Sequence, residues 1–582
     1  MRKPAEREFT THDGSRLFYR YWPALSQYST GAIVLFHRGH EHSGRLQHLV
    51  DELELRDYAM FAWDARGHGR SPGARGFSPS FGTSVRDVDG FVKHVSSSYQ
   101  IPLRDIALIA QSVGAVLAAT WVHDYAPKLR GLVLAAPAFK VKLYVPFARQ
   151  GLALQHKLRG DFFINSYVKA RFLTHDPQRI ASYESDPLIA RAISVNILLG
   201  LRAASDRIVA DAQAITLPTQ LLISGRDWVV QRAPQEAFFD RLGATVKEKH
   251  IFEDFFHDTL GERDRSQAIA LIRDFIERLF AAPPSAPSLL NADRSGYTFD
   301  EKNTLEQPLP ALSAKAISFA ITRKTMRTIG QLSAGLQLGQ ATGYDSGSTL
   351  DYVYQNKARG RWGLGRLIDR NYLDAIGWRG IRIRKRHIEQ LIALAMNALR
   401  AVHRPVHIVD IAAGLGRYAL EAATASVIKP DSIRLRDYSE ISIRAGTALI
   451  AAKGLQSIAR FELADGFDDA ALAALRPRPT LAIASGFYEL FPENEPVGRS
   501  LAGLAGALDA GSYLVYTGQP WHPQLEFIAR TLTSHRGNAK WIMRRRTQDE
   551  LDQLVTAAGF RKVDQLIDEW GIFTVSLAVR NA

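Results

Sequence analysis

Short apolar segments recur along the whole chain and alternate with amphipathic stretches long enough to form helices. Apolar strands separated by helices are typical of βαβ units with mostly parallel sheets. The same rhythm occurs in both halves and no short repeat links them, so we predict two different α/β domains. The predicted strands are residues 31–36, 59–63, 105–110, 131–136, 219–224 and 247–252 in the first half, and 405–414, 432–438, 459–465, 480–485, 511–518 and 574–579 in the second.

The proline-rich stretch FAAPPSAP separates the two halves. Adjacent prolines cannot continue a helix or the interior of a sheet, so we predict a linker at 283–296. The first domain is expected at 1–282, and the loss of strand rhythm at about 138–216 predicts a helical cap within it. Residues 297–400 are expected to form a helical extension ahead of the second sheet, at 401–582.

The composition is that of an ordinary globular protein, with 46% hydrophobic and 23% charged residues among 582. The chain contains no cysteine, which excludes disulfides, thiolate metal sites and a cysteine nucleophile. No metal-ligand spacing accompanies the candidate residues below, so we expect no metal. The N-terminal segment lacks the apolar core of a signal peptide, and no run of about 18 apolar residues follows. We therefore expect a cytoplasmic protein, at most peripheral to the inner membrane face.

The net charge is +14, and ten basic residues fall between Lys357 and Arg386, against two acidic ones. Two interpretations are open. The segment is either a solvated helix face with its loop, or an anion-binding surface for phosphate, phospholipid headgroups or nucleic acid. Nucleic acid is the less favoured partner, because the sequence shows no RNA-binding module.

A serine with the surroundings of a nucleophile follows the predicted strand at 105–110. The residues AQSVG at 110–114 lead from that strand into a run of small, apolar residues typical of a helix. A sharp turn from strand to helix exposes its middle residue at the carboxyl end of the sheet, and small neighbours allow the turn. Ser112 is therefore the candidate nucleophile.

A serine hydroxyl needs a base, and that base needs a carboxylate to orient it. Asp227 follows the predicted strand at 219–224, and His257 follows the one at 247–252. Singly, Asp227 is as readily a turn residue and His257 a residue at a helix start. Together, and in the order Ser112, Asp227, His257, they predict the triad of an α/β-hydrolase.

Two further motifs, HRGHEHSGR at 37–45 and DARGHGRS at 64–71, complete a family resemblance. Over roughly residues 8–280 the chain resembles the monoacylglycerol lipase and lysophospholipase-like group of α/β-hydrolases, also called serine aminopeptidase S33-like. The resemblance implies metal-free hydrolysis of a carboxylic ester and an oxyanion hole formed at Gly39 and Val113. It also implies a lipid-accepting cap, but packing of the cap's apolar residues on the core explains them equally well. Arg38 and His40 stand where the family has glycines.

In the second half, PVHIVDIAAGLGRY ends a predicted strand at Asp410 and then turns through Gly414 and Gly416. Glycines at such a turn let the backbone approach a ligand closely. The next predicted strand ends at Asp437, where a carboxylate can accept hydrogen bonds from a ribose, and the third ends at Asp465. Three acidic strand ends in succession predict a site for a nucleoside-containing ligand.

A dinucleotide site would need a third glycine, but Leu420 occupies that position. The pattern instead resembles class I S-adenosylmethionine-dependent methyltransferases, which have a Rossmann-like fold. The resemblance implies S-adenosyl-L-methionine as cofactor, with the methionine part at Asp410, Gly414 and Gly416, the ribose at Asp437 and the adenine near Asp465.

Residues after the fourth and fifth strands are candidates for the methyl acceptor side. They are Tyr488 and Glu489, within SGFYELF, and His522 in the next loop. Packing within the loops explains each of them equally well. SGFYELF departs from the Asn-Pro-Pro-Tyr pattern of amine-methylating enzymes, so a buried amine acceptor is less favoured.

The whole chain looks like the bacterial fusions of an α/β-hydrolase with a class I methyltransferase. The resemblance implies a bifunctional enzyme: a serine hydrolase acting on a lysophospholipid-like or monoacylglycerol-like ester, and a methyltransferase acting on a lipid or anionic small molecule. The alternative is that the second half is a non-catalytic binding module for anionic membrane or RNA.

Overall fold

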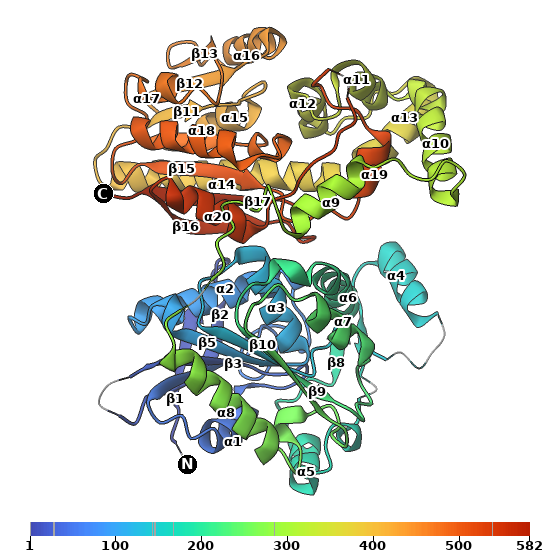
Figure 1. Ribbon diagram of the computed structural model, residues 1–582, viewed down its shortest axis with the longest axis vertical. Coiled ribbons are helices and arrows are strands. Elements are labelled where there is room, and N and C mark those ends of the chain that lie inside the picture. Colours follow the sequence, from blue (N-terminus) through green and yellow to red (C-terminus); the bar gives the residue numbers. More distant parts are fainter. Residues whose placement is uncertain are drawn as a thin grey trace. The chain divides into compact units, whose positions relative to one another are not determined.

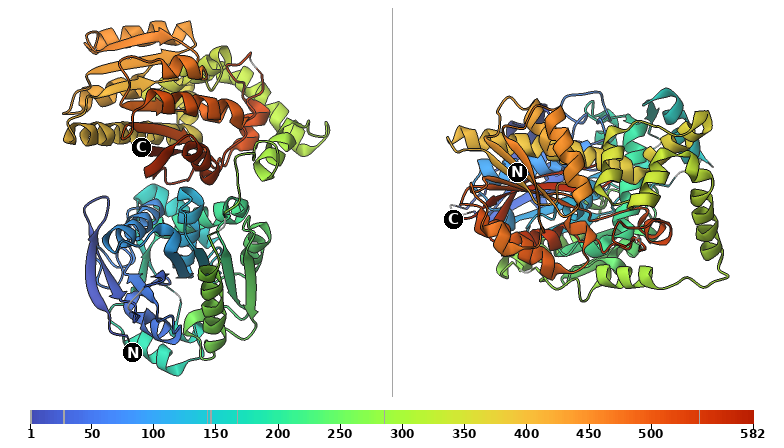
Figure 2. Two further views of the ribbon diagram at one scale, coloured as in Figure 1. Left: turned by 60° about the vertical axis from the view of Figure 1, so that its left-hand side comes forward. Right: turned by 90° about the horizontal axis from the view of Figure 1, so that it is seen from above.

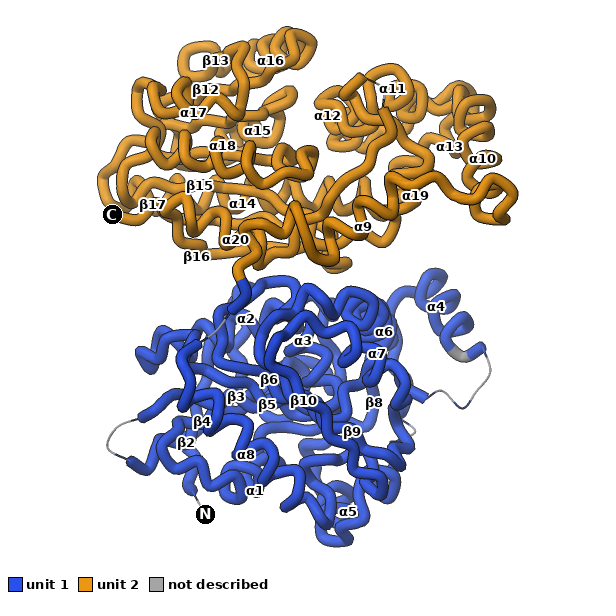
Figure 3. Tube along the Cα trace, in the orientation of Figure 1, with its two compact units in different colours: residues 1–287 blue, residues 288–582 orange. Residues whose placement is uncertain are grey.

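The computed structural model describes residues 2–26, 29–142, 144, 147–166, 168–284, 286–537 and 539–582. The chain folds into two compact units, residues 1–287 and 288–582, drawn in blue and orange in Figure 3. The division falls within the predicted linker at 283–296, in which residue 285 lies outside the described residues.

Unit 1 is built on a sheet with the strand order β1-β2-β4-β3-β5-β6-β9-β10 (Figure 1). The pairs β1–β2 and β2–β4 are antiparallel, and the other neighbours run parallel. The central strands are buried on both faces, which is why they read as continuous apolar runs. The strands are β1 (Ala5–Thr10), β2 (Arg16–Trp22), β3 (Gly31–Phe36), β4 (Tyr58–Trp63), β5 (Ile106–Gln111), β6 (Gly131–Ala135), β9 (Thr219–Ser224) and β10 (Lys247–Phe252).

Amphipathic helices cover this sheet. In the last of them, Ile269, Ile272 and Ile276 lie on one buried face, at the spacing of helical turns. The sheet helices are α1 (Gln47–Glu52), α2 (Phe81–Ser98), α3 (Val113–Tyr125), α7 (Ala233–Arg241) and α8 (Ser266–Ala281). The segment between β6 and β9 contains α4 (Ala148–Arg159), α5 (Pro177–Ser185), α6 (Val195–Ala210) and the hairpin of β7 (Phe163–Asn165) and β8 (Ala192–Ser194).

Unit 2 has a sheet in the order β13-β12-β11-β14-β15-β17-β16. The first five strands are parallel, in the doubly wound order, and the antiparallel β17 is inserted between β15 and β16. In such sheets ligands bind at the carboxyl ends of the strands, where the order reverses, here beside β11 and β14. The strands are β11 (His407–Asp410), β12 (Ser432–Asp437), β13 (Ala459–Leu463), β14 (Leu481–Ala484), β15 (Tyr513–Gly518), β16 (Phe560–Ile567) and β17 (Thr574–Arg580).

The helices that precede this sheet, α9 to α13, gather beyond one end of the strands (Figures 1 and 2). The long helix α14 connects them to the sheet, because Ile388, Leu391, Ile392 and Leu399 in its second half pack into the core. The preceding helices are α9 (Tyr297–Glu306), α10 (Ala314–Arg327), α11 (Ala334–Thr342), α12 (Gly347–Gln355), α13 (Trp362–Leu373) and α14 (Ile376–Ala401). Those within the sheet domain are α15 (Arg417–Ala425), α16 (Glu440–Ala452), α17 (Asp469–Ala473), α18 (Asn494–Ala507), α19 (Leu525–Thr531) and α20 (Gln548–Ala557).

A strand occupies each of the twelve segments predicted from the apolar pattern. Besides the short hairpin β7–β8, strands β1, β2 and β16 of the two large sheets have no counterpart among the predictions. They form antiparallel pairs at the sheet edges and mix polar with apolar residues, so they lack the continuous apolar run of a central strand. No helix in the described parts of the chain is long and apolar enough to span a membrane.

Candidate active sites

Ser112 stands at the sharp turn between β5 and α3, with backbone angles φ 55° and ψ −117°. This is a strained region for a residue with a side chain, and surrounding hydrogen bonds hold it. Its N–H donates to the carbonyl of Ala135 at 2.9 Å, and its carbonyl accepts from the N–H of Ala138 at 3.1 Å. Gly114 is required beside it, because a Cβ there would lie 2.4 Å from the carbonyl oxygen of His37.

The structure brings Ser112, Asp227 and His257 together. Ser112 Oγ lies 2.7 Å from His257 Nε2, and His257 Nδ1 lies 2.7 Å from Asp227 Oδ2. The other carboxylate oxygen of Asp227 accepts the N–H groups of Val229 and Val230 at 2.7 and 2.9 Å. Burial opposes ionisation, but His257 and these hydrogen bonds outweigh it and hold the pKa of Asp227 below its usual value. The ionised carboxylate favours a ring proton on Nδ1, which leaves Nε2 to accept from the serine.

The two residues predicted for the oxyanion hole are neighbours. Val113 is the first residue of α3, so its N–H is one of the donors that a helix leaves unpaired within its first turn. Gly39 lies in the loop after β3, and a Cβ on it would be 3.1 Å from Val113 Cγ2. Both backbone segments therefore border the nucleophile.

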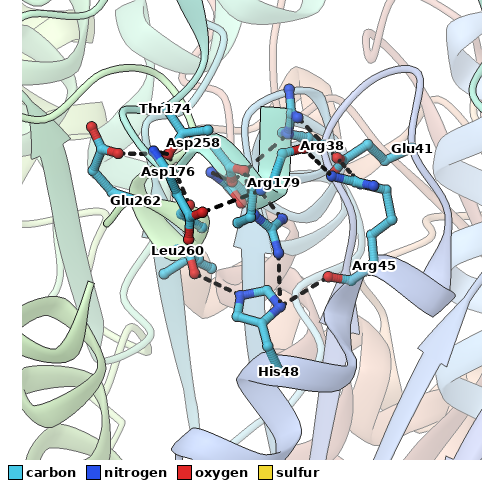
Figure 4. Close-up of polar contacts among 12 residues, drawn as sticks. Arg38, Glu41, Arg45, His48, Thr174, Asp176, Arg179, Asp258, Leu260 and Glu262 are labelled. Carbon is cyan, nitrogen blue, oxygen red and sulfur yellow. Dashed lines mark hydrogen bonds and ion pairs between the residues drawn. The ribbon is translucent and has the colours of Figure 1, made fainter. Parts of the chain in front are cut away.

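A buried ion network includes the residue before Gly39 (Figure 4). Arg38 donates to Glu41 Oε1 at 2.8 Å, and Arg45 donates to the same oxygen at 2.5 Å. Burial works against the charged carboxylate, but these arginines lower the pKa of Glu41. Arg38 stands where the hydrolase family has glycine, and its side chain pairs with the buried carboxylate of Glu41. This ion pair stabilises the loop that contains Gly39.

Asp258 connects this network to the triad and to the cap (Figure 4). It follows His257 in the chain and accepts from Gln111, the residue before Ser112, at 3.1 Å. Its other carboxylate oxygen lies 3.1 Å from Nη2 of Arg179, which α5 of the cap contributes. Burial opposes ionisation, but the arginines hold the pKa of Asp258 below its usual range. Sequence reasoning missed Arg179, because no local pattern shows which cap residue reaches the sheet.

In unit 2, β11 ends at Asp410 and the chain turns through Gly414 and Gly416 into α15. Both glycines have positive φ, 54° and 70°, a conformation that favours glycine. The N–H of Gly414 donates to Asp437 Oδ2 at 2.9 Å, so the predicted acidic ends of two neighbouring strands meet here. Burial raises the pKa of Asp410 to about 7 and also raises that of Asp437.

Asp465, the fifth predicted cofactor residue, is exposed near the glycine turn, whereas the helical extension packs directly against the turn. Asp465 is exposed, and its carboxylate accepts the N–H of Phe467 at 2.9 Å, although the backbone of Ala464 beside it pairs with that of Asp437. Gly347, at the start of α12, approaches so closely that a Cβ on it would lie 3.1 Å from the Cα of Gly414. The extension therefore covers the glycine turn.

Several buried polar atoms at this edge have no hydrogen-bond partner within the described residues. They are Asp410 Oδ2, Tyr418 Oη and Ser485 Oγ, which come from β11, α15 and the end of β14. Tyr418 lies close enough to Asp410 and Ser485 to interact with both. Buried polar groups nearly always have full hydrogen-bond partners, so this edge has room for a polar ligand that would complete them.

A cavity of about 350 Å³ lies beside the end of β14. Two predicted acceptor-side residues, Glu489 and His522, line it, together with Gly486 and with Arg384 of α14. The N–H of Gln524 donates to His522 Nδ1 at 3.0 Å, and burial lowers the pKa of His522 to about 4. The remaining wall is mostly apolar and includes Leu336, Ile368, Trp378, Ile381, Phe527 and Phe573.

Tyr488, the third predicted acceptor-side residue, does not line this cavity. Its side chain is 1% exposed within the apolar core between β14 and α18, and its hydroxyl lies 3.1 Å from Ser500 Oγ. Tyr488 begins a short 3₁₀ turn (Tyr488–Leu490), in which neighbouring residues point in different directions. One residue of the pair faces the core and the next, Glu489, faces the cavity.

The basic segment at 357–386 is only partly a solvated face. Arg370 pairs with Asp374, and Lys385 pairs with Glu389 and Glu421. Arg384 is the buried member of the ten, with 4% exposure. The signal for it was present in the sequence, because Trp378, Ile381, Arg384 and Ile388 fall on one helical face whose other members are apolar.

Comparisons with known proteins agree with this division of the chain. The profile of a family described as "Putative methyltransferase" matches residues 272–580. The chain belongs to this methyltransferase family. The profile described as "Serine aminopeptidase, S33" matches residues 27–264, so unit 1 is an α/β-hydrolase domain and unit 2 a methyltransferase domain.

Relatives cover either the whole chain or its first unit. The Escherichia coli K12 protein described as "Uncharacterized protein YnbC" is 57% identical over 579 residues, which cover 100% of this chain and 99% of that protein. Human monoglyceride lipase is 27% identical over 254 residues, 42% of this chain and 80% of that protein. Among solved structures, a monoacylglycerol lipase from Paleococcus ferrophilus is 21% identical with a TM-score of 0.40, and the match covers 48% of this chain and 99% of that one.

Proposed function

We propose that unit 1 hydrolyses a carboxylic ester with Ser112 as nucleophile. The observation that carries the proposal is the pair of 2.7 Å contacts that link Ser112 through His257 to Asp227. His257 takes the serine proton as Oγ attacks the ester carbonyl, and Asp227 stabilises the resulting imidazolium. The N–H groups of Gly39 and Val113 receive the developing oxyanion. The alcohol then leaves with the proton from His257, and water releases the acid from the serine ester.

The relatives of unit 1 support an ester of monoacylglycerol type, and we extend the proposal to lysophospholipid-like esters. Monoglyceride lipases are among the proteins similar to it. The cap exposes Phe147, Leu154 and Leu158 at 80, 60 and 74%, with Lys157 and Arg159 beside them. An exposed apolar surface with adjacent cations is suited to a lipid interface.

The test of this proposal is turnover of p-nitrophenyl esters and of monoacylglycerols by the full chain. Replacing the serine hydroxyl in Ser112→Ala should remove turnover while the fold and the melting temperature stay unchanged. Substitution of the nearby Ser78, which is buried but outside the triad, provides a matched control: Ser78→Ala should keep most of the activity. Normal turnover by Ser112→Ala would contradict the assignment of the nucleophile.

For unit 2 we propose methyl transfer that uses S-adenosyl-L-methionine. When bound, this molecule supplies a methyl group on a positively charged sulfur. The residues present fit it: Asp410 offers an unpartnered carboxylate oxygen to an ammonium, and Asp437 stands where a ribose diol would be accepted. Gly414 and Gly416 keep the turn open to close approach.

Calorimetric titration of the full chain with S-adenosylhomocysteine tests the cofactor proposal. We expect a single saturable site, weakened roughly ten- to hundredfold in Asp437→Ala, because hydrogen bonds to a charged group are lost. The exposed Asp509 lies after α18, away from these strand ends, and Asp509→Ala should bind normally. Absence of binding to the unaltered chain would remove the cofactor proposal.

We also propose that unit 2 contacts an anionic membrane surface rather than RNA. At the start of α13, Trp362, Leu364 and Leu367 are 79, 59 and 67% exposed, and the exposed Arg361 and Arg366 lie among them. Aromatic and aliphatic side chains interleaved with arginine on one short helix suit insertion at a headgroup boundary.

A further inference from the structure

The acceptor cavity of unit 2 is lined by a buried cation, and the carboxylate that faces it lies beyond hydrogen-bond distance. Arg384 is 4% exposed, and its Nε has no hydrogen-bond partner within the described residues. The carboxylate of Glu489 faces it, but Oε1 lies 3.9 Å from Nη1, beyond hydrogen-bond distance. The guanidinium otherwise interacts with the Tyr354 hydroxyl through a side-chain hydrogen bond and stacks over the ring of Phe573, 5.1 Å from its centre. A charge in such surroundings is costly unless a ligand completes its hydrogen bonds.

Arg384 is also placed at the reactive end of the cavity. Gly486, which follows β14, lies against it, because a Cβ there would be 2.9 Å from Nη2. Arg384 is close enough to Tyr418 of α15 for the two to interact electrostatically, and Tyr418 in turn interacts with Asp410. The guanidinium therefore lies between the apolar cavity and the glycine turn assigned to the cofactor.

The two candidate bases in the cavity are held by hydrogen bonds to neighbouring groups. His522 Nδ1 holds the N–H of Gln524 at 3.0 Å, so the neutral ring carries its proton on Nε2 and is a donor toward the cavity. Glu489 Oε1 accepts the hydroxyl of Thr517 at 2.7 Å and faces Arg384, while Oε2 is buried without a hydrogen-bond partner within the described residues. An alcohol or a phenol, with a pKa of about 10 or more, would need such a base.

We infer that the methyl acceptor of unit 2 is the carboxylate of an apolar acid, bound by Arg384 with its hydrocarbon part in the cavity. This inference rests on the methyl-transfer function proposed above. A carboxylate is already ionised at neutral pH, so no base is required, and a guanidinium is matched to it in charge and shape. The mostly apolar wall and the volume of about 350 Å³ suit a hydrocarbon chain of moderate length.

The reaction balances without any further reagent. A carboxylate oxygen forms a bond to the methyl carbon while the carbon–sulfur bond breaks, and the electron pair remains on sulfur. The products are a methyl ester and a neutral thioether, and no proton is released. An ester hydrolase is the class of enzyme that releases such a carboxylate, which is the chemistry proposed for unit 1. It would also cleave a methyl ester, so the two activities oppose each other on one product.

Because the hydrolase would cleave the methyl ester that the methyltransferase forms, the experiment uses a variant without the serine nucleophile. The full chain with Ser112→Ala is incubated with S-adenosylmethionine carrying a deuterated methyl group and with decanoate, oleate, decanol or para-hexylphenol. We expect labelled methyl esters of the two acids, detected by mass spectrometry, and no labelled ether. With Ser112 intact, the esters should accumulate less.

Substitution of the arginine supplies a second readout. In the same background, Arg384→Gln should lower kcat/KM for decanoate roughly ten- to hundredfold, and Arg384→Lys should restore part of it, since about one or two hydrogen bonds to a charged group are lost. Calorimetric binding of decanoate in the presence of S-adenosylhomocysteine should weaken in parallel, while binding of S-adenosylhomocysteine itself reports that the fold is intact. The exposed Arg386 on the same helix is the matched control, and Arg386→Gln should change neither quantity.

The outcomes separate this inference from the function on which it rests. Failure of the chain to bind S-adenosylhomocysteine would remove both. Normal binding of it with a labelled ether from decanol or para-hexylphenol, or with no ester from either acid, would overturn the carboxylate inference alone. Ester formation that survives Arg384→Gln would overturn the role of the arginine.

Discussion

The candidate sites of the two units differ in how complete they are. In unit 1 the three candidate catalytic residues satisfy one another: Ser112, His257 and Asp227 bond to one another and to backbone N–H groups. In unit 2, Asp410 and Arg384 leave buried polar atoms unpartnered within the described residues. A nucleophile that attacks its substrate directly can be assembled by folding alone. A site that binds two molecules before the reaction has polar groups that form their hydrogen bonds only when the ligands are bound. The chemistry of these unpaired groups therefore indicates which groups the ligands carry.

The largest effect that would test this difference between the units is expected at the contact between His257 and Asp227. Asp227→Asn keeps the shape of the triad but replaces the carboxylate that orients His257, so the ring can settle with its proton on Nε2. We expect ester turnover to fall roughly 10³- to 10⁴-fold. The measurement is kcat for p-nitrophenyl butyrate, with S-adenosylhomocysteine affinity as the internal control for unit 2. A loss below tenfold would mean that the geometry in unit 1 is not the working one.

The same contrast explains how much the sequence could predict. Ser112, Asp227 and His257 could be found because each follows a strand of the parallel part of the sheet, and parallel strands bring their carboxyl ends to one edge. Gly414 and Asp437 could be found for the same reason. All twelve predicted strands are such apolar segments, whereas the polar edge strands β1 and β16 carry no comparable signal.

The remaining site residues depend on packing between elements distant in the chain. Arg179 reaches Asp258 from the cap, and Arg384 reaches the end of β14 from the helical extension. No local spacing specifies these meetings. Tyr488 shows another limit of sequence reasoning, because it immediately follows a site segment yet its side chain points into the core. Position after a strand predicts where a residue is, but not which way its side chain turns.

A smaller effect is expected from pH on the affinity of unit 2 for S-adenosylhomocysteine. It would test whether the polar groups of unit 2 are completed by a ligand. Burial raises the pKa of Asp410 to about 7, so the carboxyl is largely protonated at pH 6 and largely ionised at pH 8. Only the ionised form can pair with the ammonium of S-adenosylhomocysteine. Affinity should therefore rise about tenfold from pH 6 to pH 8. Asp410→Asn should bind weakly at both values, without the dependence on pH.

The melting temperature of the unliganded protein provides the control for this prediction. Because the folded-state pKa of Asp410 is raised, its contribution to the stability of the unliganded protein is present at low pH and decreases as the pH rises toward about 7. The melting temperature of the unliganded chain should thus move opposite to the affinity, while Asp410→Asn removes both trends. An affinity that does not change between pH 6 and pH 8 would contradict the pairing of Asp410 with the ammonium.

The smallest effect is expected at the two exposed apolar helices, where the units resemble each other. Leu158 on α4 and Trp362 on α13 are 74 and 79% exposed beside basic residues. If each unit draws an apolar substrate from a bilayer, Leu158→Ala and Trp362→Ala should each weaken sedimentation with vesicles of phosphatidylglycerol and phosphatidylcholine by about three- to tenfold, the loss of one inserted side chain. Added salt should weaken binding further, because the arginines act through surface charge. The exposed Val427, on a surface loop without a basic cluster, is the control, and Val427→Ala should bind normally. Equal loss from all three variants would show that the apolar helices have no special role, and a loss confined to Leu158→Ala would assign the membrane contact to the hydrolase unit alone.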